Sequence, residues 1–217
     1  MKTFFLSMAF LSIAISASRA QQTVVVPAVP PPPVSPPPVV VVPQAAALDP
    51  VVIQRQLSTA PVLRTTRTTT VVETPGRPTR VYESERNVVV VEDQGQFREM
   101  PYVTLPVLFV KETAELLDAA SRAALEQTAG VIRNVVATDP KARFDIEGHT
   151  STDGTTEFNA SLSAARAQRV YEELTRRYAV PATVLSAHGY GESFPAYPNG
   201  TEAQMQLDRR VLVVRTR

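Results

Sequence analysis

A strand, a polar loop and an amphipathic helix follow one another in the segment ARFDIEGHTSTDGTTEFNASLSAARAQRV, residues 142–170. In its first seven residues the apolar Phe144 and Ile146 alternate with charged neighbours, which predicts a half-buried strand over 142–148. The polar residues 149–155 predict a loop. After the loop, apolar side chains recur at three- and four-residue spacing, which predicts a helix with one apolar face that ends before Pro181.

Elements of the same two kinds flank this unit. The expected elements are a strand at 103–110, a helix at 117–135, a strand at 184–190, a short helix at 202–207 and a last strand at 211–216. The order strand, helix, strand, helix, strand, short helix, strand predicts an α/β fold. We expect a two-layer β/α sandwich, with helices on one small sheet, formed by residues 101–217.

The N-terminus reads as an export signal. Lys2 precedes the apolar run Phe4–Ile15, and Ser18-Arg19-Ala20 follows with small residues at its first and third positions. This is typical of a secretory signal peptide, residues 1–20, cleaved after Ala20. The run is shorter than the roughly 20 residues of a membrane span, so we expect no transmembrane segment in the mature chain. Anchoring as a lipoprotein requires a cysteine, and the sequence has none.

The next eighty residues read as a tether. Ten of the 19 prolines lie between residues 21 and 50, and such runs favour the extended polyproline II conformation of a semi-rigid linker. Residues 51–100 are of low complexity around Arg64–Thr70 and contain the breaker Pro75-Gly76-Arg77-Pro78. We expect them to be linker, with a short hairpin formed by 79–84 and 87–92.

Composition excludes several classes of function. Without cysteine there is no disulfide, thiolate metal site or cysteine nucleophile, and two histidines are too few for a multi-histidine metal centre. The formal charge of +1, from 22 basic and 21 acidic residues, excludes a strongly basic nucleic-acid binder. No Gly-x-Ser-x-Gly nucleophile elbow is present. We expect no enzymatic activity, no cofactor and no metal.

The predicted loop and second helix bring together groups of opposite charge. Asn159 and Arg166 are seven residues apart, so they lie on the same face of the helix. Arg166 can grip a carboxylate with two hydrogen bonds, and Asp153 in the loop can hold an ammonium group. Such a pair suits a ligand with both charges, such as the free end of an amino acid. The alternative is a surface Asp–Arg pair, worth less than about 1 kcal/mol.

An ordered series of motifs runs through the C-terminal half. Its members are Gly148-His149-Thr150, Asn159, Leu162-Ser163, Arg166-Ala167, Gly189-Tyr190-Gly191-Glu192-Ser193, Pro195 and Arg209-Arg210-Val211. The series resembles the OmpA-like peptidoglycan-binding domain of OmpA, Pal lipoproteins and MotB stators, over about residues 103–217. The resemblance implies a β/α sandwich that binds diaminopimelate in peptidoglycan stem peptides, in the periplasm, with outer-membrane or other envelope proteins as further partners. It places the ligand-binding arginine at Arg166, with Thr150 and Asn159 ordering the loop.

One residue departs from the family pattern. The family aspartate that follows Gly-x-Thr falls at Ser151, and serine cannot neutralise an ammonium group. Three possibilities follow: Asp153 replaces that aspartate, the site binds more weakly, or the domain has lost its ligand. In the last case the protein is a structural adaptor that docks to other envelope proteins. The family also tends to have Asn at Asp208 and Glu at Leu212.

Overall fold

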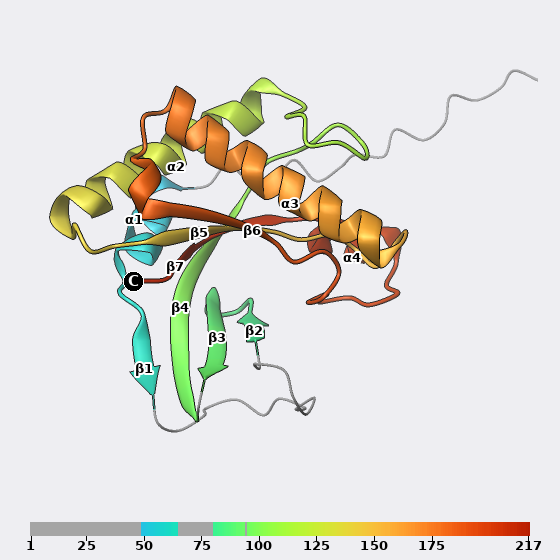
Figure 1. Ribbon diagram of the computed structural model, residues 1–217, viewed down its shortest axis with the longest axis horizontal. Helices are drawn as coiled ribbons and strands as arrows, with labels where there is room; N and C mark the ends of the chain where they lie inside the picture. The colour runs from blue at the N-terminus through green and yellow to red at the C-terminus, as the bar shows by residue number, and fades with distance from the viewer. Residues whose placement is uncertain (1–48, 65–79, 94) are drawn as a thin grey trace, which may run out of the picture. The chain divides into compact units, whose positions relative to one another are not determined.

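The computed structural model describes residues 49–64, 80–93 and 95–217 (Figure 1). The predicted signal peptide lies outside the described residues, as does the predicted proline-rich tether up to residue 48. In the part of the chain that is described, every helix is too short or too polar to cross a bilayer.

One curved sheet organises the described residues. Its strands, in spatial order, are β2 (Arg80–Glu83), β3 (Val88–Asp93), β4 (Gln96–Leu105), β7 (Val211–Arg215), β5 (Phe144–Gly148) and β6 (Leu185–Gly189), and β1 (Val62–Arg64) also pairs with β4. Strands β5 and β6 are parallel, and the other pairs are antiparallel. The parallel pair needs a crossover, which the second predicted helix supplies.

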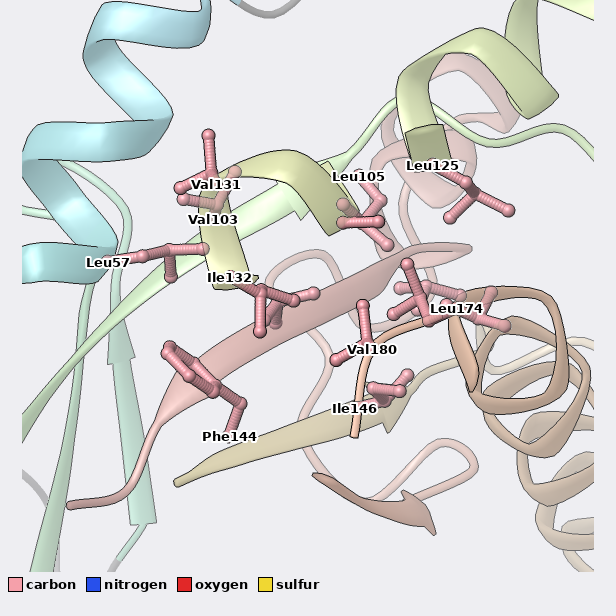
Figure 2. Close-up of a cluster of buried hydrophobic side chains, with 14 of the residues drawn as sticks. Leu57, Val103, Leu105, Leu125, Val131, Ile132, Phe144, Ile146, Leu174 and Val180 are labelled. Carbon is pink, nitrogen blue, oxygen red and sulfur yellow. The ribbon is translucent and has the colours of Figure 1, made fainter. Parts of the chain in front are cut away.

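Helices cover one face of the sheet. In Figure 1, α2 (Ala119–Thr138) and α3 (Thr156–Glu172) lie above β5, β6 and β7, and a π-helical turn, Glu173–Arg177, extends α3. A short helix, α4 (Glu202–Asp208), precedes β7. The side chains between helices and sheet form a continuous apolar core (Figure 2), which includes Leu105, Leu125, Ile132, Phe144, Ile146, Leu174 and Val180. This mixed sheet with helices packed on it is the α/β architecture that the sequence predicts.

The second face of the sheet is covered by the β2–β3 hairpin. Along β7, Val211 and Val213 belong to the helix-side core, whereas Leu212 and Val214 pack with Val89 of β3 in a second apolar cluster. Strand β7 is therefore buried on both faces, which explains its nearly continuous apolar sequence. An apolar Leu212, where the family tends to have Glu, fits this covered face.

Polar groups are also sealed under the hairpin. Glu147 of β5 is fully buried; it forms an ion pair with Arg80 and accepts a hydrogen bond from the Tyr82 hydroxyl at 2.8 Å. The ring of His149 packs edge-on against Tyr82, with 5.0 Å between ring centroids, and is itself 1% exposed. Arg80, Tyr82, Glu147 and His149 are called the buried cluster below.

Residues 51–100 differ from the expected linker. The expected hairpin is present as β2 and β3. A helix that the sequence did not predict, α1 (Pro50–Ser58), precedes it, and its Ile53 and Leu57 are fully buried in the helix-side core. Arg215 of β7 donates a 3.0 Å hydrogen bond to the Leu57 carbonyl oxygen, one of the acceptors that a helix end leaves free. Much of this stretch thus belongs to the folded part of the chain.

The strand predicted at 103–110 lies earlier, as β4 (Gln96–Leu105). Pro106 has no N–H for the sheet. Beyond it, residues 108–117 fold back on themselves through hydrogen bonds from the Val110 N–H to the Glu115 carbonyl, 2.8 Å, and from the Leu117 N–H to the Leu108 carbonyl, 2.9 Å. The apolar residues after Pro106 therefore form a loop beside α3 instead of continuing the strand.

Candidate functional site

Two glycines let α3 lie directly on the end of the sheet. Gly148 and Gly189 face each other across β5 and β6. A Cβ on Gly148 would lie 2.2 Å from the Ser163 carbonyl oxygen, and one on Gly189 would lie 2.2 Å from the Ala164 nitrogen. No larger residue fits at these positions without moving the helix. This close approach fixes α3 beside the loop that leaves β5.

A groove of about 870 Å³ opens where that loop meets α3. The segment 107–112 and Leu117 line one side, and the loop, α3 and the α4 region line the others. The lining residues from these last three parts are Thr150, Ser151, Asp153, Gly154, Phe158, Asn159, Leu162, Arg166, Glu202, Gln206 and Arg209. The groove thus combines an apolar wall with groups of both charges.

Within the groove, and among the described residues, Arg166 is the guanidinium with unused N–H donors. Its Nε donates a hydrogen bond to the Thr113 carbonyl oxygen at 3.0 Å, and its Cζ lies 5.0 Å from the centroid of the Phe109 ring. Its Nη1 and Nη2 have no carboxylate partner among the described residues. Burial, and then the nearby charge of Arg209, lower the pKa of Arg166 from its ordinary value, because both disfavour its charged form. An anionic ligand would relieve this cost.

Asp153, by contrast, is already paired. Its Oδ2 accepts a 2.7 Å hydrogen bond from Arg209 Nη2 and a longer one, 3.4 Å, from the Ser151 hydroxyl. Its Oδ1 has no recorded partner in the described part of the chain. The Arg209 guanidinium also binds Glu202 of α4. Asp153, Arg209 and Glu202 form one ion-pair group on the rim of the groove, called the acidic pole below.

The other three expected site residues lie at the same place. Asn159 is buried, and its amide donates to the backbone oxygens of Ser151 and Asp153 at 3.3 and 2.8 Å and to Glu192 at 2.5 Å. These bonds fix the shape of the loop. Thr150 lines the groove, and its buried Oγ1 has no hydrogen-bond partner among the described residues. Ser151 accepts a 3.1 Å hydrogen bond from Arg209 Nε.

The two arginines before β7 point to different places. Alternation predicts that one of them approaches the site and the other faces solvent. Arg209 lies in the groove, but the expectation for Arg210 was wrong, because it is half-buried, bonded to Asp208 at 2.9 Å, and stacked over Tyr82. Asp208 itself accepts from the N–H groups of Ala196 and Tyr197. Glu202 was not among the expected site residues, and its signal in the sequence is only its position seven residues before Arg209.

The two histidines, both within the described residues, lie outside the groove. In the buried cluster, both ring nitrogens of His149 lack a hydrogen-bond partner within the described residues, and the ring is sealed between Tyr82 and Tyr190. His188 is exposed and bonds to Asp145 at 2.7 Å. Among the described residues no three His, Asp or Glu side chains are arranged to hold a metal ion.

The chain is similar to proteins of one known family. Residues 108–209 match the OmpA family. The chain is 30% identical over 143 residues to the outer-membrane lipoprotein YfiB of Pseudomonas aeruginosa, an alignment that covers 64% of this chain and 81% of YfiB. It is 39% identical over 72 residues to outer membrane porin F of the same organism, covering 33% of this chain and 21% of the porin.

Two solved structures are similar to this chain. The periplasmic domain of Helicobacter pylori MotB is 20% identical, with a TM-score of 0.46 and coverage of 63% of this chain and 85% of that domain. The peptidoglycan-associated lipoprotein of Burkholderia pseudomallei is 24% identical, with a TM-score of 0.43 and coverage of 52% and 88%. The chain spans only about a quarter of the length of the first curated porins that it matches. The YfiB alignment and the family match together show that the chain belongs to the OmpA family, whose non-catalytic domains typically bind peptidoglycan in the cell envelope.

Proposed function

We propose that the groove binds the free amino-acid end of diaminopimelate in peptidoglycan stem peptides. In this proposal Arg166 holds the carboxylate and Asp153 holds the ammonium group. Asn159 shapes the loop, Ser151 supports Asp153, and Thr150 offers an unused hydroxyl to the ligand. Through this contact the protein tethers to the cell wall, without catalysis.

The observation that carries this proposal is that Arg166 and Arg209, two arginines of one groove, use different numbers of their N–H donors within the protein. An arginine has five N–H donors. Arg166 spends one of them, from Nε, on the Thr113 carbonyl oxygen. The four on its Nη atoms remain for a ligand, and a carboxylate takes two of them in parallel. The acidic pole has two carboxylates for one cation, so it carries a net charge of about −1. A positive group and a negative pole in one groove match the two charges of an amino-acid end.

Co-sedimentation with purified peptidoglycan sacculi tests this function. We expect the protein to pellet with sacculi, Arg166→Ala to lose most of this retention, and Asp153→Ala to be weakened. Arg176→Ala is the matched control, since Arg176 has the same charge but an exposed side chain outside the groove. Retention of Arg166→Ala at the wild-type level would reject the assignment of the site.

One observation favours a second candidate function, an adaptor that docks to other envelope proteins. Asp153 is already engaged by Arg209, which reduces its capacity for an ammonium group. If this pairing has abolished wall binding, calorimetry will detect no heat with a diaminopimelate-containing muropeptide. We also propose that the chain is exported to the periplasm, with association to the outer membrane as the alternative, consistent with the outer-membrane relatives.

A further inference from the structure

Arg209 differs from Arg166 in that all its donors are used. Its Nε binds Ser151 Oγ at 3.1 Å. Its Nη1 binds Glu202 Oε1 and Gln206 Oε1, and its Nη2 binds Asp153 Oδ2 at 2.7 Å and Glu202 Oε2 at 3.3 Å. These contacts account for the five N–H groups of an arginine. Arg209 therefore has no donor left for a ligand, and its effect is to hold the groups around it.

The two carboxylates that Arg209 holds remain open to solvent. The side chains of Asp153 and Glu202 are 56% and 71% exposed, whereas that of Arg209 is 25% exposed. The carboxylates of the acidic pole are thus more exposed than the cation that pairs with them, although Arg209 binds Asp153 Oδ2 and both oxygens of Glu202. A carboxylate has about four lone-pair sites, so each can still accept a further hydrogen bond from a ligand. The pKa of Glu202 is lowered, mainly by its hydrogen bonds from Arg209, so its carboxylate stays charged.

Glu202 lies on a short helix that is fixed at both ends. It is the first residue of α4, whose N-terminus is capped by reciprocal hydrogen bonds between Thr201 and Gln204. The last residue of α4, Asp208, is buried. The groove in front of it also contains Thr150, a nine-tenths-buried hydroxyl without a partner among the described residues. An ammonium ligand has three donors, so it can use more than one oxygen acceptor.

We propose that Glu202 is a second ammonium-binding carboxylate of this groove and that Arg209 is the residue that positions Glu202 and Asp153. The carboxylates of Glu202 and Asp153 together take the place of the carboxylate that the family has at Ser151. The ligand class is a primary ammonium group next to a carboxylate, as at the end of a diamino acid in a peptide. The inference rests on the proposed function, because it assigns the ammonium half of the same ligand.

Calorimetry with three synthetic tripeptides separates the two halves of the ligand. All have L-Ala-γ-D-Glu at the start. The peptides differ in the third residue. In the first it is meso-diaminopimelate, in the second it is 2-aminopimelate, which lacks the terminal amine, and in the third it is lysine, which lacks the terminal carboxylate. For Glu202→Gln we expect about tenfold weaker binding of the diaminopimelate peptide and unchanged binding of the 2-aminopimelate peptide, the loss of one charged hydrogen bond. Glu126→Gln, at an exposed site on α2, is the matched control and should bind like wild type.

A positioning role for Arg209 predicts the same selectivity. Arg209→Met should weaken binding of the diaminopimelate peptide more than binding of the 2-aminopimelate peptide. Adding Ser151→Asp to Glu202→Gln should recover part of the lost affinity for the diaminopimelate peptide. Thermal melting verifies that each variant is folded. If Glu202→Gln affects the two peptides equally, or affects neither while Arg166→Ala still weakens binding, the inference fails and the proposed function stands. If wild type binds none of the peptides, both fail.

Discussion

The buried cluster and the groove are two charged sites that both include residues of the segment 147–153, and they use arginine in opposite ways. In the buried cluster, Arg80 pairs with Glu147, whose side chain is completely buried, beneath a hairpin. In the groove, Arg166 keeps its Nη atoms free of any carboxylate among the described residues and lines an open space. The difference shows that burial and saturation of hydrogen bonds, and not charge itself, distinguish a structural pair from a binding group.

The largest effect should follow from breaking the buried pair. Glu147→Ala leaves the Arg80 guanidinium buried without a counter-charge, and it removes the acceptor of the Tyr82 hydroxyl. We expect the free energy of unfolding to fall by about 3–5 kcal/mol in urea titration. Glu126→Ala, on the exposed face of α2, should change it by less than about 0.5 kcal/mol. A loss below about 1 kcal/mol at Glu147 would show that the cluster contributes little to stability.

The second effect should appear in binding alone. Arg166→Ala removes a charged double hydrogen bond to the proposed ligand, so we expect affinity for the diaminopimelate tripeptide to fall by about 1.5–3 kcal/mol. Its unfolding free energy should stay within about 0.5 kcal/mol of wild type, because its one hydrogen bond is to an exposed loop. A fall in stability as large as that at Glu147 would remove the distinction between the two sites.

The third effect concerns pH. Burial is the main cause that lowers the pKa of His149 below 6.5, and the charges of Arg210 and Arg80 act in the same direction, while Glu147 opposes them. The unfolded chain therefore takes up the proton first as pH falls. The stability that the neutral, buried His149 ring contributes is therefore complete above about pH 6.5, and it is lost as the pH falls below that value.

Urea unfolding at about pH 7.5 and 5.5 measures this slope. We expect His149→Gln to reduce the loss of stability at the lower pH. An unchanged slope in His149→Gln would mean that the buried cluster does not sense pH.

The smallest effect should come from restoring the family residue. Ser151→Asp adds a negative charge next to Arg209 Nε, so affinity for the ammonium-bearing tripeptide should rise about two- to fivefold. Ser161→Asp, on the exposed face of α3, controls for net charge. Weaker binding in Ser151→Asp would indicate that the added carboxylate draws Arg209 away from Asp153.

The sequence predicts the parts of this molecule that have clear local periods. Helices α2 and α3 and strand β5 are recognisable because their apolar residues repeat regularly, strand β7 because it is almost entirely apolar, and the loop between β5 and α3 because it is polar. Helix α1 is not, since only Ile53 and Leu57 of its nine residues are buried. Its start signal was nevertheless present, as Asp49 caps the helix and Pro50 occupies the first turn.

The candidate site is predictable only in part. The motif spacing brings Arg166, Asn159, Thr150, Ser151 and Asp153 into one groove. It does not predict that Asp153 pairs with Arg209, because that pairing depends on where α4 ends and on the small side chain of Ser151. Nor does it predict Glu202, which reaches the groove from a short helix with a weak apolar pattern.

An ¹⁵N-resolved NMR titration of the protein with the diaminopimelate tripeptide tests the central claim most directly. The account predicts saturable shifts for the amides of Thr113, residues 150–154, Arg166 and the stretch 202–209, and unshifted amides for Arg80 and Tyr82 under the hairpin. Shifts confined to surfaces outside the groove, or no shifts at ligand concentrations that saturate retention on sacculi, would contradict it.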